Sequence, residues 1–168
     1  GAMDQISGIL DRMKELTVQG SNGTYATAGL AAMSAEFTAL YSEMDRITNS
    51  TDFNGTQVIG DAATIAFQVG DTETVANDQI SLVTTDSTNV SLAVSITTQT
   101  LAIAAIALVD TAIGLVDTQR GVLGAAGNRL EFAVNNLMSR AENQSAARSR
   151  IEDTDFAVES ANLAKNQV

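Results

Sequence analysis

The side chains that could do chemistry in this chain are almost all carboxylates. Glu36, Glu43 and Asp45 fall within one predicted helix, where neighbouring acids could share a metal ion. Helical di-iron sites, however, combine Glu with Glu-x-x-His pairs, and the chain contains no histidine. We therefore interpret these three acids as charges that keep a helix surface solvated.

Two further patterns suggest ligand binding but have the wrong spacing or context. Asp71, Glu73 and Asp78 could hold calcium, but their spacing is not that of an EF-hand loop. The series Gly121-x-x-Gly124-x-x-Gly127 is no phosphate loop, because it lies inside a predicted helix and follows no strand. Cysteine is absent as well as histidine, which removes thiolate nucleophiles and the commonest general base. We predict no catalytic residue, no metal, no cofactor and no enzyme activity.

The charge distribution argues against nucleic-acid and membrane partners. The 168 residues include 20 acids and 9 bases, which gives a net charge of -11. All the bases lie at or before Arg46 or at or after Arg120, so the middle of the chain has no cation. Nucleic acids and anionic membranes both need clustered Lys and Arg. In addition, no apolar run approaches the ~20 residues of a membrane span.

Hydrophobic periodicity predicts three main helices, and these helices position the acidic residues and the glycine series described above. Aromatic residues make up only 4% of the chain, and there is no proline to interrupt a long helix. The first helix is expected over residues 4–19 and the second over 27–47. Their apolar positions step by three and four residues, as in a heptad seam: Ile6, Ile9, Met13 and Thr17, then Leu30, Met33, Phe37, Leu40, Met44 and Ile47.

The third helix is expected over residues 92–140, on the order of 60–70 Å at ~1.5 Å per residue. Four glycines, Gly114, Gly121, Gly124 and Gly127, cost it about 1 kcal/mol each relative to alanine. In return we expect close approach of a neighbouring backbone. A short helix is predicted from Asp155 onward. Thr154 is the candidate N-cap of this short helix. The seam of the third helix is expected at Ala105, Val109, Ala112, Val116, Gln119, Leu123, Ala126, Leu130, Ala133 and Leu137.

The segment between the second and third helices is predicted to be a small β element. Asn54-Gly55 is a strong tight-turn signal, and the runs 56–59, 63–69 and 80–84 are rich in Ile, Val and Thr. Residues 85–92 are polar and irregular. The predicted fold class is therefore mainly α: an elongated three-helix rod with heptad-like seams and a small β-hairpin element in the middle.

Two blocks at opposite ends of the chain resemble bacterial flagellin, the filament-building protein of the flagellum. Residues 10–24, LDRMKELTVQGSNGT, resemble its N-terminal rod helix and the turn that follows. Residues 128–157, NRLEFAVNNLMSRAENQSAARSRIEDTDFA, resemble its C-terminal rod. Phe53-Asn54-Gly55 and the segment 119–137 add to the resemblance, which covers most of the chain.

The resemblance implies a domain organisation. Residues 1–3 are expected to be an expression-tag remnant. N-terminal rod helices are expected over 4–50, the β-hairpin and a connecting loop over 51–91, and the long C-terminal rod helix over 92–142. Residues 143–168 would form a junction toward a core domain. By this resemblance we expect a truncated form that lacks the terminal core helices of flagellins. The outer domains would be either naturally absent or deleted, and the smooth sequence across residues 80–100 favours a naturally short flagellin.

The resemblance further implies a structural subunit of the extracellular filament. An open polymer needs two complementary surfaces on each subunit. We expect contacts at Asn128, Arg129, Asn135 and Arg140 and at Arg12 and Gln19 of the first helix, although a solvated helix face would present the same residue types. The isolated fragment is expected to be monomeric.

Recognition by an innate-immune Toll-like receptor is also implied, because such a receptor grips the flagellin rod. The family's recognition residues carry over onto Arg12, Leu16, Gln19 and Glu36. At ~100° per residue, the first three share one helix face. We expect them to be exposed together, with Leu16 as an apolar anchor and Arg12 as a forked donor. The competing interpretations are that Leu16 is the edge of the core and Glu36 an ordinary surface acid.

Two alternatives remain. A hook–filament junction protein belongs to the same assembly, but residues 149–167 resemble flagellin more closely. An unrelated helical adaptor module would expose an apolar groove, whereas no leftover apolar stripe is expected once the three seams pair.

Overall fold

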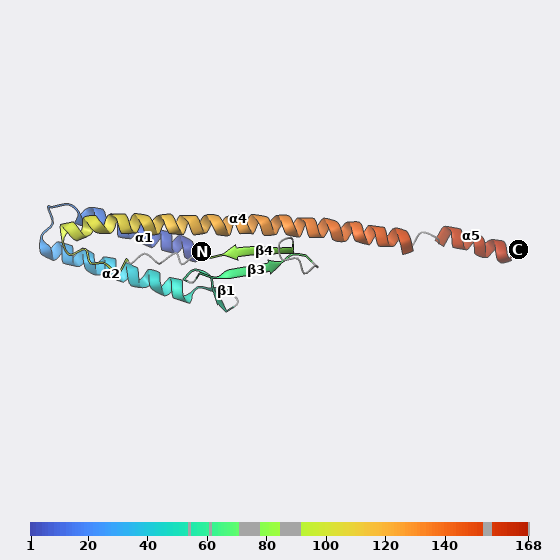
Figure 1. Ribbon diagram of the computed structural model, residues 1–168, viewed down its shortest axis with the longest axis horizontal. Helices are drawn as coiled ribbons and strands as arrows, with labels where there is room; N and C mark the ends of the chain where they lie inside the picture. Colours follow the sequence, from blue (N-terminus) through green and yellow to red (C-terminus); the bar gives the residue numbers. More distant parts are fainter. Residues whose placement is uncertain (54, 61, 71–77, 85–91, 153–155, 168) are drawn as a thin grey trace.

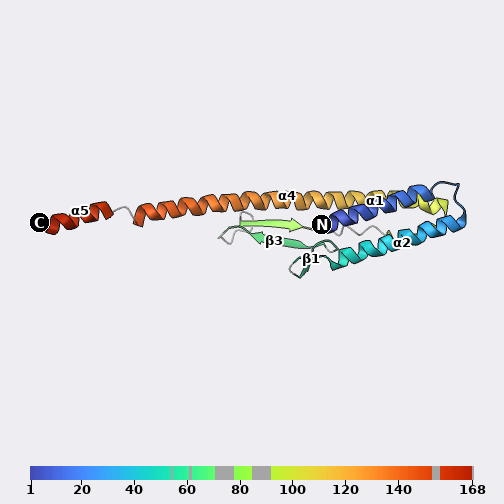
Figure 2. The ribbon, with the colours of Figure 1, turned by 180° about the vertical axis from the view of Figure 1, so that it is seen from behind.

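The protein is a long helical rod. The computed structural model describes residues 1–53, 55–60, 62–70, 78–84, 92–152 and 156–167. The helix α4 (Gln99–Glu152) spans most of the length, and α1 (Ala2–Gly20), α2 (Thr27–Ser50) and the strands lie along one part of it (Figures 1 and 2). The predicted fold class, mainly α and elongated, is confirmed.

The helix α1 is the centre of the packed part, because it contacts both α2 and α4. Its buried positions step by three and four residues and form a heptad seam. Of the predicted stripe, Ile9 is only half-buried, and Leu10 takes its place in the core. The full buried set is Met3, Ile6, Leu10, Met13, Leu16, Thr17 and Gly20.

Residues 1–3 belong to this packing. The helix begins at Ala2, and Met3 lies in the core with only 8% of its surface exposed. Leaving the first three residues out of the fold was therefore wrong, since Met3 extends the seam by one further step before Ile6.

The predicted seam of α2 is confirmed. Leu30, Met33, Phe37, Met44 and Ile47 are buried, and Leu40 is half-buried against the same core. The side chain of Phe37 is fully buried and is among the largest in the core. The other fully buried side chains of the hydrophobic core are aliphatic or Met, and Tyr41 packs half-buried against them.

The predicted start of α4 was wrong by seven residues. The stretch 92–98 is not helical, although Leu92 and Ile96 are buried. The amide of Ile96 donates a hydrogen bond to Oγ of Ser34 at 3.3 Å. The stretch is rich in β-branched side chains, which have lower helix propensity; together with the bond to Ser34, this favours an extended backbone.

The predicted end of α4 near residue 140 was also wrong, because the helix continues to Glu152. The added segment 141–152 contains Ala, Glu, Gln and Arg, which favour helix, and no Pro or Gly. Arg148 and Glu152 form an i,i+4 ion pair at 3.0 Å within it. The short tail helix is observed as α5 (Phe156–Gln167), whereas its predicted cap Thr154 lies outside the described residues.

The seam of α4 is buried along the part that α1 and β4 accompany. Ala126 is the last buried residue of the helix, Leu130 and Ala133 are half-buried, and Leu137 is 40% exposed. We call residues 127–152 the distal segment of α4. It extends past the N-terminus of α1 and past α2, as Figure 1 shows.

The glycines of α4 do not serve the predicted close approach. A Cβ added at Gly114, Gly121, Gly124 or Gly127 would meet no atom within 4 Å. The close contact occurs instead at Gly20 at the end of α1, where a Cβ would lie 3.1 Å from the Cβ of Ala102 in α4.

The β element consists of two separate antiparallel pairs, whereas one hairpin with a further strand was expected. β1 (Asp52–Phe53) pairs with β2 (Thr56–Gln57), and β3 (Thr64–Gln68) pairs with β4 (Gln79–Val83). Between β1 and β2, Gly55 has φ of +77°, as a tight turn requires. β4 lies against α4 and buries Ile80 and Leu82. Of the predicted polar segment 85–92, residues 85–91 lie outside the described residues.

One stretch of α4 is apolar and long enough to cross a membrane by length and composition alone. The statement that no apolar run approaches a membrane span was therefore wrong. This is the one such stretch in the described part of the chain, and 28% of it is buried. Core helices of proteins without membrane contact pass the same test, and Val109, Ala112 and Val116 pack in the core.

Candidate functional site

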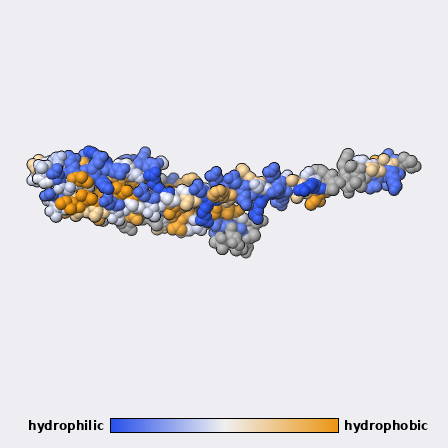
Figure 3. All heavy atoms as spheres, turned by 90° about the horizontal axis from the view of Figure 1, so that it is seen from above, coloured by the Kyte–Doolittle hydropathy of each residue, from blue (hydrophilic) through white to orange (hydrophobic). Residues whose placement is uncertain are grey.

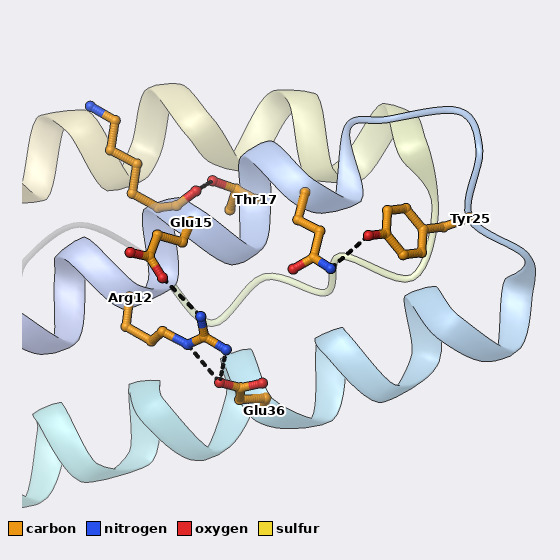
Figure 4. A network of polar contacts seen from close by, with 7 residues as sticks. Arg12, Glu15, Thr17, Tyr25 and Glu36 are labelled. Atoms are coloured by element: carbon orange, nitrogen blue, oxygen red, sulfur yellow. Dashed lines mark hydrogen bonds and ion pairs between the residues drawn. The ribbon is translucent and has the colours of Figure 1, made fainter.

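The first candidate surface lies on α1 and α2, and we call it the Arg12 surface (Arg12, Glu15, Gln19, Tyr25 and Glu36). Figure 4 shows its polar contacts. The guanidinium of Arg12 donates to Oε1 of Glu36 on α2 at 2.8 Å and to Oε2 of Glu15 on α1 at 2.8 Å. Hydrogen bonds from Glu15 and then Glu36 raise the pKa of Arg12. Arg12 therefore ties α1 to α2 while about half of its side chain stays in solvent, with 47% exposed.

The same surface continues toward the turn after α1. Nε2 of Gln19 donates a hydrogen bond to the Tyr25 hydroxyl at 2.7 Å (Figure 4). On the α4 side of α1, Lys14 forms an ion pair with Asp110 at 2.7 Å, and this contact raises the pKa of Lys14. Polar contacts thus fix α1 to a neighbour on either side.

Leu16 does not belong to the exposed surface. Only 1% of it is exposed, and it packs in the core, so its expected exposure as an apolar anchor was wrong. The reason is that α1 contacts two helices, and a helix between two neighbours buries a wider stripe than a single seam. Arg12, Gln19 and Glu36 are exposed as expected.

Two members of the Arg12 surface were missed in the sequence. Glu15 lies three residues after Arg12, a spacing at which helical side chains meet, so that its contact could have been predicted. Tyr25 lies in the turn between the two helices, and no periodicity signals that its hydroxyl would reach Gln19.

The second candidate surface is the distal segment of α4. Asn128, Arg129, Asn135 and Arg140 are all exposed there. Among the described residues, no ion pair involves Arg129 or Arg140. The rod narrows toward this end, as the space-filling view of Figure 3 shows.

The distal segment also exposes large apolar side chains, so the expectation that no apolar stripe is left over was wrong. These residues are Phe132 at 75%, Val134 at 49%, Leu137 at 40%, Met138 at 67% and Ile151 at 80% exposure. Neither α1 nor α2 reaches this far, so these side chains stay uncovered. Val134, Leu137 and Met138 fall on one side of the helix, and Phe132 falls on the opposite side. The end of β3 and α4 enclose a cleft of about 670 Å³ that includes Gln68, Leu137 and Arg140.

Charge is divided unequally between the two surfaces. Residues 120–168 contain six of the nine bases and an equal number of acids, so that the entire net charge of -11 lies in residues 1–119. The distal segment of α4 is therefore the less acidic end of a strongly acidic molecule, and acidic surfaces of other chains would be repelled least there.

Two of the three acids considered first have ion-pair partners, and two of the three candidate calcium ligands lie outside the described residues. Glu36 pairs with Arg12, and Glu43 pairs with Arg46 at 2.6 Å, which lowers the pKa of Glu43. Asp71 and Glu73 lie outside the described residues. In the part of the chain that the structure describes, no three acids are close enough to hold a metal ion.

The fold defines the class of protein: an elongated, mainly α rod whose longest helix exposes apolar side chains. The family comparison is specific. Residues 1–64 match the bacterial flagellin N-terminal helical region and residues 106–168 match the bacterial flagellin C-terminal helical region. The chain belongs to the bacterial flagellin family, which confirms the resemblance drawn from the sequence.

Individual relatives agree with this assignment. The chain is 39% identical to a flagellin of Halalkalibacterium halodurans over 95% of its own length and 60% of that protein. It is 34% identical to a flagellin of Bacillus subtilis over its whole length and 67% of that protein. The crystal structure of Bacillus cereus flagellin superposes with a TM-score of 0.70 at 29% identity, covering 87% of this chain and 85% of that one. The adaptor alternative is thereby excluded.

Proposed function

We propose that this chain is a structural, non-enzymatic part of the extracellular bacterial flagellar filament. The observation that carries the proposal is the uncovered distal segment of α4 in a chain of the flagellin family. The chain spans 60% of the length of the Halalkalibacterium halodurans relative, so assembly is proposed here and not read from that relative. A junction protein between hook and filament is not favoured, since the relatives named above are flagellins.

Assembly would use the distal segment of α4 as one of two complementary surfaces. Arg129 and Arg140 are eleven residues apart, which at ~100° per residue places them within about 20° of each other around the helix. Phe132 and Asn136 fall between them on the same side. This surface combines an apolar centre with two exposed cations, and its complement would be an acidic surface in residues 1–119 of a neighbouring subunit. Because the two surfaces differ, the contact is heterologous and can repeat without closing.

Filament elongation tests the proposal. Sheared filaments of Bacillus subtilis serve as seeds, soluble flagellin of the same species as the subunit, and light scattering as the readout. The chain alone is expected to remain monomeric. Added in excess, it should slow elongation by occupying growing ends, because 34% identity over its whole length preserves part of the contact surface. An unchanged elongation rate at saturating chain would contradict the proposal.

We further propose that the Arg12 surface is recognised by a Toll-like receptor, through Arg12, Gln19 and Glu36. What supports this is the exposed, pre-formed Arg12–Glu36 contact between two helices, with 47% and 45% of the side chains exposed. Its geometry is fixed before binding, which lowers the entropy lost on association. Leu16 would contribute only by shaping the core beneath, since its side chain is buried.

Binding of the receptor ectodomain tests this second proposal. The double variant Arg12→Ala/Glu36→Ala should lose affinity at least about tenfold, the size expected for a central charged pair at an interface. The matched control is Glu43→Ala/Arg46→Ala, which removes another exposed ion pair from α2. Equal affinities of the two double variants, or no binding by the unaltered chain, would contradict recognition through the Arg12 surface.

A further inference from the structure

The five methionines of the chain divide sharply by exposure. Met3, Met13, Met33 and Met44 lie in the core, with between 0% and 8% of their surfaces exposed. Met138 is 67% exposed. The four buried thioethers are shielded from solutes by helix packing, whereas that of Met138 is open to them.

Met138 lies in the middle of the distal segment of α4. Val134, one turn earlier, is 49% exposed, and Leu130, two turns earlier, is half-buried. Together with exposed Ala141, these residues follow one another by steps of four, four and three, so that they share one face of the helix. Met138 is the only sulfur-containing side chain on that face, and a flexible, polarisable thioether adapts well to a docking partner.

We propose that Met138 is a peroxide-sensitive modification site that switches this face from apolar to polar. The thioether sulfur attacks one oxygen of a hydroperoxide, an S–O bond forms, and the O–O bond breaks. The sulfur is oxidised by two electrons to the sulfoxide. The peroxide is reduced, and its second oxygen leaves as water or an alcohol after taking up the proton.

The modification leaves the fold intact and changes only the surface. Met138 contributes nothing to the buried core, and its backbone lies within a continuous helix. The sulfoxide places a strong hydrogen-bond acceptor on the Leu130–Met138 face, where a partner helix would leave it unsatisfied. Met138 lies on the side of the helix opposite to Arg129 and Arg140, about 160–180° around it, so its face would be a second contact of the distal segment. Resting on the proposed filament function, we infer that oxidation weakens the contact of this second face with a neighbouring subunit.

Peptide mass spectrometry after graded hydrogen peroxide treatment of the folded chain tests the site itself. Met138 should be oxidised at least about tenfold faster than any other methionine, because the others react only through opening of the core. Circular dichroism should be unchanged at complete Met138 oxidation. Oxidation of the core methionines at a similar rate would overturn the proposal, and so would loss of helix on oxidation of Met138 alone.

The elongation assay tests the consequence. The oxidised chain should lose at least half of its inhibition of elongation, and Met138→Gln, which mimics the polarity without oxidant, should lose a similar share. Met138→Leu should keep the inhibition and make it resistant to peroxide. Equal inhibition by oxidised and reduced chains would overturn the switch. If the reduced chain itself fails to inhibit, the filament proposal fails, while selective oxidation still decides whether the site exists.

Discussion

Phe37 has the greatest effect on stability that a single side chain can be expected to have here. Its ring is fully buried at the centre of the core, whereas the ring of Phe132 is 75% exposed. Phe37→Ala should lower the free energy of unfolding by about 3–5 kcal/mol, through lost burial and the cavity left behind. Phe132→Ala should change it by about 0.5 kcal/mol or less. Urea denaturation measures both, and similar values would contradict the assignment of the core.

Acidic residues predict how stability depends on pH. The Arg46 hydrogen bond lowers the pKa of Glu43, and the terminal ammonium group of Gly1 followed by Arg120 lowers that of Asp4. A lowered folded-state pKa adds stability above the unfolded-state value, and this is lost as the pH falls through the folded-state value. The loss should therefore begin below the ordinary values of 4.5 and 3.8.

Thermal melts at pH 7, 5 and 3 measure this dependence. With no histidine in the chain, the melting temperature should change little between about pH 6 and 8. It should fall toward pH 3, and it should fall less in the double variant Asp4→Asn/Glu43→Gln, which has lost the two titrating groups. An equally steep fall in the variant would contradict the role given to these two carboxylates.

Phe37 and Leu16 illustrate which buried positions can be predicted from the sequence and which cannot. The heptad steps of α2 were enough to place Phe37 and its neighbours in the core, because one periodic stripe needs only one partner. Leu16 could not be placed in this way. Its burial depends on a third helix on the other side of α1. The sequence of a single helix does not reveal how many helices will pack against it.

The elements differ in how well their ends could be predicted. α2 was placed well, and the Asn54-Gly55 turn fits the observed register, in which Phe53 pairs with Thr56. α4 was misplaced at either end. Its true start depends on a hydrogen bond to Ser34, far away in the sequence, and its end has no proline or glycine to mark it. The position of β4 likewise depends on contacts with α4, which its own sequence does not reveal.

The glycines provide a test of how closely α1 and α4 approach. Gly114→Ala should raise the free energy of unfolding by about 0.5–1 kcal/mol, because the added methyl enters open space in a helix interior. Gly20→Ala introduces a Cβ at 3.1 Å from that of Ala102. Gly20→Ala should therefore lower the free energy of unfolding. Chemical denaturation of the two variants would contradict the packing if Gly20→Ala stabilised as much as Gly114→Ala.

Hydrogen exchange tests the division of α4 into a covered and a distal part. Amides between Ala102 and Gln119 should exchange at least about tenfold more slowly than those of residues 130–152, because only the former lie against α1. The two parts belong to one continuous helix, so each serves as the control for the other. Uniform protection along α4 would contradict the uncovered state of the distal segment.

The molecule as a whole combines an asymmetric shape with an asymmetric charge. The packed part carries the entire net negative charge, whereas the thin end has balanced charges and exposes apolar residues such as Phe132 and Met138. Identical acidic rods repel one another when they lie side by side in register. A staggered arrangement avoids this repulsion by placing the distal segment of one chain beside the acidic part of the next.

The most direct test of the central claim is a charge reversal in the distal segment. Elongation from filament seeds is measured in the presence of the unaltered chain, of Arg140→Glu and of Arg46→Glu, two variants with the same change in charge. The unaltered chain and Arg46→Glu should slow elongation, and Arg140→Glu should have lost most of this effect because an acidic neighbour would now be repelled. Equal inhibition by the two variants would contradict a subunit contact on the distal segment of α4.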